Sequence, residues 1–320
     1  MLGFAVILVG SLCLAAQNVL LRVIFSESPI LGQGVWGGFI PATVGNSVLV
    51  LQMRSLLILP VMLILAPWFY PGTQQALRDL VKPDQRSLLW RSLISSTFLF
   101  LSLTFLFIAI ATIPAGTATV LFFTHPVITG LVSWRLFGDR PSWIRLTMTG
   151  TVLMGSVLVV PIAGAISPDQ MWLGVGAALA ACVTYSIQGV LAQTCFRTIH
   201  PVPFTVVNFV VMAVLSTLGL VLVTIDVPAE AWGVLWGISA LASALTLAGQ
   251  LLYNVGIHLV SAALMSIVAV SNPVSTTLMA WIFLQETLTL RQGMGVGIVV
   301  LSIAILGYEK AQQSQVRSKG

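Results

Sequence analysis

Long apolar runs with almost no charged residues dominate this chain of 320 residues and decide what it can fold into. Hydrophobic residues make up 58% of the sequence and charged residues 7%, which is too few to cover a surface exposed to water. An apolar helix of about 20 residues is long enough to cross the hydrocarbon core of a bilayer. Because lipid offers no hydrogen-bond partners, such segments satisfy their backbone groups within helices. The sequence therefore predicts an all-α membrane protein.

The apolar runs are separated by short segments rich in Pro, Gly, Asn and Asp, and we predict ten transmembrane helices. The first run is interpreted as an uncleaved span and not as a signal peptide, because no basic residue precedes it. The predicted spans are residues 3–25, 47–70, 89–110, 114–137, 142–163, 171–194, 201–224, 231–254, 261–284 and 289–308.

The positions of Lys and Arg predict the orientation of these spans, since cytoplasmic loops carry an excess of both. With the amino terminus inside, eleven of the 14 basic residues lie on the cytoplasmic side and three, Arg22, Arg54 and Arg291, on the other. Both termini are then cytoplasmic. The basic residues are dispersed between apolar runs and form no patch for nucleic acid.

An internal repeat relates the two halves of the chain. Residues 105–150 align without a gap on residues 252–297, so that Pro126 falls on Pro273 and Trp134 on Trp281. Because each half holds an odd number of spans, five, the second half enters the membrane inverted. Inverted repeats are a recurring architecture of secondary transporters, with the substrate site near the midplane between the halves. We divide the chain into a first repeat, a second inverted repeat and a cytoplasmic tail: residues 1–164, 165–308 and 309–320.

Two matching segments resemble a known family. The residues from Ala111 through His125-Pro126-Val127 to Gly150 resemble an EamA-type repeat, and so do those from Ser261 through Asn272-Pro273-Val274 to Gly297. EamA repeats belong to the drug/metabolite transporter superfamily. The resemblance implies ten helices around a central cavity, export of amino acids or other metabolites, and location in the inner membrane of a bacterium.

Polar residues within spans are costly and are therefore the candidates for substrate binding. Arg54 lies inside the second predicted span, near Gln52. Its guanidinium group is suited to an anionic group such as a substrate carboxylate. The alternative is that the side chain extends to the outer lipid headgroups.

The first and sixth predicted spans supply Gln17, Asn18, Tyr185 and Gln188. Gln17 and Gln188 are related by the repeat and could face one cavity from opposite sides. Amides both donate and accept hydrogen bonds, which suits a polar neutral or zwitterionic solute. The alternative is that they bond neighbouring helices to one another.

Gln250, Tyr253 and Asn254 lie three and four residues apart and share one face of the eighth predicted span. A polar face of this kind turns toward protein or water and not toward lipid. It either lines the cavity or makes packing hydrogen bonds.

The pairs His125-Pro126 and Asn272-Pro273 are helix breakers at corresponding positions of the two repeats. Paired interruptions point toward a binding site, although a purely structural bend is the alternative. His125 is a candidate for proton coupling, because an unperturbed imidazole changes its charge near neutral pH, and the alternative is a hydrogen-bonding role.

Several other features have structural explanations. Trp134 and Trp281 are expected at the membrane interfaces. Asp139 and Glu286 are read as turn or interface residues and not as proton carriers. Gly293 and Gly297 are spaced for close helix contact, either within the chain or in a homodimer.

The sequence holds no acidic residue in the middle of a predicted span, no phosphate-binding loop and no catalytic motif of a hydrolase. We therefore expect no enzyme activity and no cofactor or metal. The sequence predicts a secondary transporter, an exporter or exchanger, of a small polar metabolite such as an amino acid. The alternatives are an intramembrane lipid-modifying enzyme and a non-transporting membrane scaffold.

Overall fold

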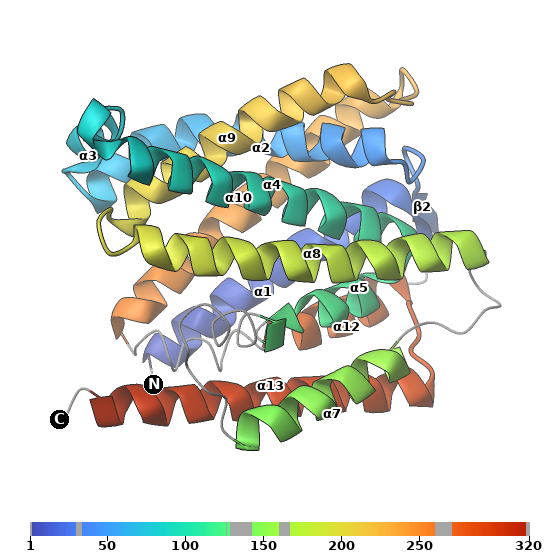
Figure 1. Ribbon diagram of the computed structural model, residues 1–320. Helices are drawn as coiled ribbons and strands as arrows, with labels where there is room; N and C mark the ends of the chain where they lie inside the picture. Colours follow the sequence, from blue (N-terminus) through green and yellow to red (C-terminus); the bar gives the residue numbers. More distant parts are fainter. Residues whose placement is uncertain are drawn as a thin grey trace.

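The computed structural model describes residues 2–29, 34–125, 127–128, 143–159, 167–259 and 271–317, and this part of the chain is almost entirely helical (Figure 1). Apolar composition and internal backbone bonding favour helices throughout. The elements are α1 (Leu2–Phe25), β1 (Glu27–Pro29), β2 (Val35–Gly37), α2 (Val44–Phe69), α3 (Thr73–Leu80), the 3-10 helix η2 (Pro83–Gln85), α4 (Arg86–Thr112), α5 (Ala115–Phe122), α7 (Trp143–Val159), α8 (Pro168–Cys195), α9 (Pro201–Leu222), α10 (Ala231–Leu259), α12 (Ser271–Leu284) and α13 (Leu290–Arg317).

Six helices in the described part of the chain are long and apolar enough to cross a membrane. They are α1, α2, α4, α8, α9 and α10, and they lie where the sequence predicts its first, second, third, sixth, seventh and eighth spans. The other four predicted spans overlap α5, α7, α12 and α13. Shorter apolar stretches occur at Leu146–Val159 and Leu290–Ile305. The predicted helical fold is thereby confirmed for the described residues, six of its helices are suited to crossing a membrane, and the total of ten spans stays a prediction.

The helices pack in a small number of extensive pairs. The largest contacts join α4 to α8, α1 to α10, α7 to α13 and α2 to α9. In Figure 1 the pair α2–α9 lies along the upper edge and the pair α7–α13 along the lower edge, with the other two pairs between them. The main apolar core runs through the middle and includes Leu21, Val50, Ile110 and Ala178.

The contact between α7 and α13 depends on Gly155 and Gly295. A Cβ atom on Gly295 would lie 2.7 Å from the Gly155 carbonyl oxygen, so only glycine permits this approach. By contrast, Cβ atoms on Gly293 and Gly297 would meet none of the described atoms within 4 Å. These two glycines therefore make no close packing contact with the described residues, and the two alternatives, packing within the chain and a homodimer contact, stay predictions.

The predicted linker from 26 to 46 forms part of the structure. Strands β1 and β2 pair in antiparallel fashion, with Ser28 opposite Trp36. Gly37 has a φ of +112°, and a Cβ there would lie 2.5 Å from the Ser26 carbonyl oxygen. Glycine is required at this turn because L side chains avoid both the conformation and the contact.

The start of α2, which carries Arg54, is fastened to the segment before α10. The Asn46 side-chain amide donates to the carbonyl oxygens of Pro41 and Asp226 at 2.9 Å, and its oxygen accepts from the Asp226 amide at 3.0 Å. Next to it, a Cβ on Gly45 would lie 1.9 Å from the Thr224 carbonyl oxygen. These contacts set the position of α2 beside the helices of the second half.

Candidate functional site

Arg54 is buried on α2 with 5% of its surface exposed. Its Nη2 atom donates to the Thr246 hydroxyl of α10, and its Cζ atom lies 5.0 Å from the centre of the Phe107 ring of α4. The interpretation that this side chain extends to the lipid headgroups is therefore wrong. Arg54 is held between three helices in the interior of the bundle.

Thr246 connects Arg54 to the amides of α1. Its hydroxyl lies 3.4 Å from the Gln17 side-chain oxygen, and the Gln17 amide donates to the Asn18 side-chain oxygen. Asn18 in turn donates to the Thr276 hydroxyl of α12 at 3.4 Å. We call Arg54, Thr246, Gln17, Asn18 and Thr276 the polar network. It joins three residues predicted from the sequence to two threonines that the sequence analysis missed.

Gln52 does not belong to this network, although it lies two residues before Arg54. Its side-chain oxygen accepts from the Ser216 hydroxyl, and its amide donates to the Thr217 hydroxyl at 2.7 Å. Both partners are on α9. Gln52 therefore bonds α2 to α9, while Arg54 faces α10.

His125 and Tyr185 come together in a cluster of aromatic rings. The ring centres of His125 and Tyr185 are 4.7 Å apart, and the Phe122 ring lies 5.1 Å from that of Tyr185. The His125 carbonyl oxygen accepts from the Ser186 hydroxyl at 3.0 Å. This cluster packs the end of α5 against α8. Pro126 lies outside the described residues, so the predicted helix break there is not tested.

Among the described side chains, those of Gln188, Asn272 and Gln250 show no hydrogen bond to the polar network. Gln188 is buried on α8, and its backbone carbonyl accepts from Ser95 at 3.2 Å. Among the described contacts, none links Gln188 to Gln17. Asn272 on α12 donates to the Ser11 carbonyl oxygen at 3.4 Å. Gln250 is exposed on α10.

Two candidate binding residues, Tyr253 and Asn254, and two residues with predicted structural roles, Trp134 and Asp139, lie wholly or partly outside the described residues. The backbones of Tyr253 and Asn254 belong to α10, but their side chains lie outside the described residues. Trp134 and Asp139 lie outside the described residues altogether, backbone and side chain. Trp281, the repeat mate of Trp134, is 55% exposed near the end of α12, as an interfacial anchor would be.

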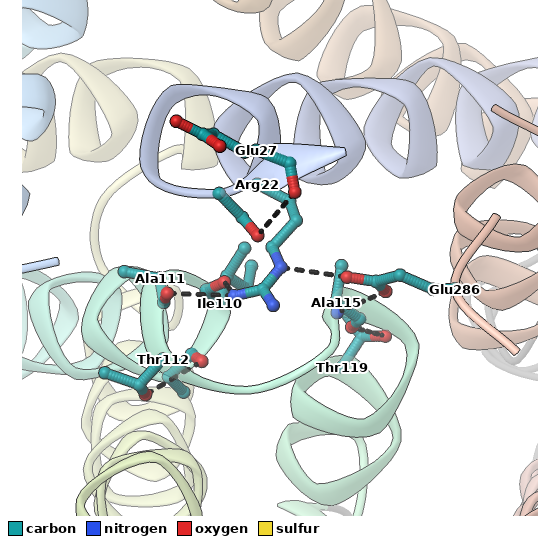
Figure 2. A network of polar contacts seen from close by, with 10 residues as sticks. Arg22, Glu27, Ile110, Ala111, Thr112, Ala115, Thr119 and Glu286 are labelled. Atoms are coloured by element: carbon teal, nitrogen blue, oxygen red, sulfur yellow. Dashed lines mark hydrogen bonds and ion pairs between the residues drawn. The ribbon is translucent and has the colours of Figure 1, made fainter. Parts of the chain in front are cut away.

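A second, largely buried group, Arg22 with Glu286, was not singled out from the sequence as a site (Figure 2). The Arg22 Nε atom lies 2.8 Å from the Glu286 Oε1 atom, and the two side chains are 10% and 14% exposed. The Arg22 Nη1 atom donates to the carbonyl oxygens of Ile110 and Ala111 at 2.9 and 2.8 Å. The other carboxylate oxygen of Glu286 accepts from the Ala115 amide at 3.1 Å.

This ion pair caps two helix ends. The last carbonyls of α4 and the first amides of α5 have no partners within their own helices. A cation at the carboxyl end and an anion at the amino end also match the two helix dipoles. Gln285, with a φ of +52°, turns the chain after α12 just before Glu286. No spacing in the sequence could have indicated the pairing, because the partners are 264 residues apart.

The comparisons with known proteins agree with this architecture. The sequence matches the EamA-like transporter family over residues 1–160 and 172–308. An uncharacterized transporter of Synechocystis sp., sll1319, is 36% identical over 314 residues, which are 98% of this chain and 95% of that protein. A solved crystal structure, similar in fold alone at 18% identity, covers 95% of this chain and 94% of its own with a TM-score of 0.52. The family and the named transporter point to a transporter of a small molecule rather than to an enzyme. The chain is an integral membrane protein and belongs to the EamA-like transporter family.

Proposed function

We propose that this protein is a secondary transporter, an exporter or exchanger, of a small polar metabolite such as an amino acid. The observation that carries the proposal is the polar network, in which α2 of the first half bonds α10 of the second half directly and α1 links α10 to α12. Polar side chains inside a membrane bundle are costly and mark substrate pathways. The proposed substrate-binding residues are Gln17, Asn18, Arg54, His125, Tyr185, Gln188, Gln250, Tyr253, Asn254 and Asn272.

The substrate would reach this site alternately from the two sides through ten spans arranged as two inverted repeats, residues 1–164 and 165–308. The helix contacts support this division. In this division the first-half helices α1, α2, α4, α5 and α7 correspond in order to α8, α9, α10, α12 and α13. The contact of α4 with α8 then has a counterpart in the second half, the contact of α10 with α1, and both are present. Likewise α1–α12 becomes α8–α5, and α4–α9 becomes α10–α2. Exchanging the two halves leaves three contacts unchanged, because each joins a helix to its own counterpart: α2–α9, α5–α12 and α7–α13. This is expected when the two halves are related by a two-fold axis.

The Arg22–Glu286 ion pair is the proposed closure of one entrance. Arg22 and its carbonyl partners belong to the first repeat, and Glu286 belongs to the second. Opening the bundle at this end would separate the two repeats and therefore the ion pair. The conformation described here, with the ion pair intact, is closed at that end under this proposal.

The orientation proposed from the basic residues places this closure on the outer side. The excess of Lys and Arg puts both termini and the tail 309–320 in the cytoplasm. Arg22 lies at the opposite end of α1 from the amino terminus. The bacterial plasma (inner) membrane is the proposed location.

Counterflow in proteoliposomes tests the proposal. Vesicles with the purified protein are loaded with pooled amino acids, nucleosides, sugars and organic acids, and mass spectrometry follows which solutes exchange. We expect saturable exchange of one class and its loss in Gln17→Met. Gln52→Met is the matched control, because both glutamines are buried in spans but Gln52 bonds α9 instead of the polar network. Failure of the folded wild-type protein to exchange any solute would contradict the proposed function.

A further inference from the structure

Arg54 is a buried cation that pairs with no acidic side chain in the described part of the chain. Among the described residues the ion pairs are Arg22–Glu286 and Lys82–Asp79, and neither involves Arg54. Its Nε and Nη1 atoms are buried and have no hydrogen-bond partner among the residues that the structure describes. Its Nη2 atom donates to a neutral hydroxyl, that of Thr246. Two of the three guanidinium nitrogens are therefore left to bind something else.

The charge of Arg54 persists in this setting, because the guanidinium group remains protonated in proteins. A buried charge is costly unless it is paired and hydrogen-bonded. The Phe107 ring, 5.0 Å from the Arg54 Cζ atom, offers partial compensation. All acidic residues of the chain lie in connections, at predicted helix ends or in the tail. A full counter-charge for Arg54 is therefore best supplied by a ligand.

We propose that Arg54 binds a carboxylate of the transported solute and that this solute carries a net negative charge. Charge-assisted hydrogen bonds from a guanidinium group to a carboxylate are among the strongest in proteins. One unpaired cation balances one carboxylate, whereas a phosphate carries more charge. The inference rests on the proposed function and narrows its substrate class.

The composition of the polar network separates a monoanion from a zwitterion. An α-amino acid also carries an ammonium group, which requires a carboxylate or several oxygen acceptors. The other members of the polar network, Thr246, Gln17, Asn18 and Thr276, are all neutral. Their side-chain oxygens already accept hydrogen bonds within the polar network, Thr246 from Arg54, Gln17 from Thr246, Asn18 from Gln17 and Thr276 from Asn18, and none carries a negative charge to balance an ammonium group.

Three probes with one carbon skeleton test the charge preference: lactate as the anion, alanine as the zwitterion and lactamide as the neutral form. The phenyl series of 3-phenyllactate, phenylalanine and 3-phenyllactamide repeats the comparison at larger size. Binding to the purified full chain is measured by the shift of its thermal unfolding, and movement by counterflow. In at least one series we expect the anion to bind at least about tenfold more tightly than the other two probes.

Two variants assign this preference to Arg54. Arg54→Gln is expected to lose the preference for the anion, and Arg54→Lys to retain part of it. Because Arg54 is buried without a counter-charge, Arg54→Gln is expected to unfold at no lower temperature than wild type, so that lost binding is not lost folding. Lys82→Gln is the control, since it removes an exposed cation in the connection between α3 and α4.

The outcomes separate this inference from the proposed function. Exchange of zwitterionic or neutral solutes with no preference for the anion would leave a transporter and overturn the inference. An anion preference unchanged in Arg54→Gln would also overturn it, and so would stabilisation by potassium chloride with none by either carboxylate. If the folded protein neither binds nor exchanges any probe or pooled solute, the proposed function fails together with the inference.

Discussion

Arg22 and Glu286 meet at 2.8 Å although 264 residues separate them in the chain. Each partner also caps a helix end, Arg22 at α4 and Glu286 at α5. The charges are therefore compensated by each other and by free backbone groups. Removing one partner of a buried pair leaves the other uncompensated, which costs more than the net worth of the pair.

Glu286→Gln is expected to destabilise the folded protein by about 2 kcal/mol. The side-chain oxygen of Gln can still accept from the Ala115 amide, but the charge opposite Arg22 is lost. The change in the free energy of unfolding in detergent measures this effect. Asp79→Asn is the control, because it breaks the exposed pair with Lys82 and should cause no measurable change. Equal stability of Glu286→Gln and wild type would show that the buried pair contributes nothing.

The pair is also expected to show coupling in a double-mutant cycle. The double variant Arg22→Met with Glu286→Gln should be less destabilised than the sum of the two single variants, by about 1–3 kcal/mol. The reason is that each single change leaves an unpaired group, while the double change removes the charge from both sides. Additive effects of the two changes would contradict a direct interaction.

If the pair closes one entrance, its loss should open that entrance more often. In a variant without Cys13, Cys182 and Cys195, a cysteine introduced at Ala111 reports access at this end. A membrane-impermeant thiol reagent added from outside should label Ala111→Cys several-fold faster when Glu286→Gln is present. Labelling at the same rate with and without Glu286→Gln would contradict the role as a closure while leaving the stability prediction intact.

Thr246→Val is expected to weaken solute binding several-fold, because Thr246 connects Arg54 with Gln17 and valine keeps the shape but not the hydroxyl. The half-saturating concentration in counterflow measures the effect. Thr97→Val is the matched control, since the Thr97 hydroxyl bonds the Leu93 carbonyl of its own helix. An equal half-saturating concentration in the two variants would mean that the Thr246 hydroxyl makes no specific contribution to solute binding.

Gly295→Ala is expected to destabilise the protein by about 1–3 kcal/mol, because its Cβ would lie 2.7 Å from the Gly155 carbonyl oxygen and the backbone cannot yield easily. Gly293→Ala, on the same helix with open space around the added methyl group, should be neutral or slightly stabilising. Thermal unfolding of the two variants side by side makes the comparison. A neutral Gly295→Ala would show that α7 and α13 are further apart than described here.

Particular residues show how far sequence reasoning could go at the site. Gln17, Asn18 and Arg54 were predicted because a polar side chain in an apolar run is visible in the sequence, and the structure joins them in one network. Thr246 and Thr276 were missed, since a threonine in a membrane helix usually bonds its own backbone and carries no distinctive signal. Arg22 and Glu286 were assigned to the ends of spans, where charged residues are ordinary.

The sequence by itself determined that the chain crosses a membrane in helices, where the six helices long and apolar enough to do so lie, and which family it belongs to. These properties follow from hydropathy and repeated motifs, which are local along the chain. Only the tertiary structure decided that Gln52 bonds α9 while Arg54, two residues later, meets α10. The physical reason is that each residue turns a helix by about 100°, so a partner depends on the rotation of the helix and on its neighbours. Distant pairs such as Arg22–Glu286 depend in the same way on how helices assemble.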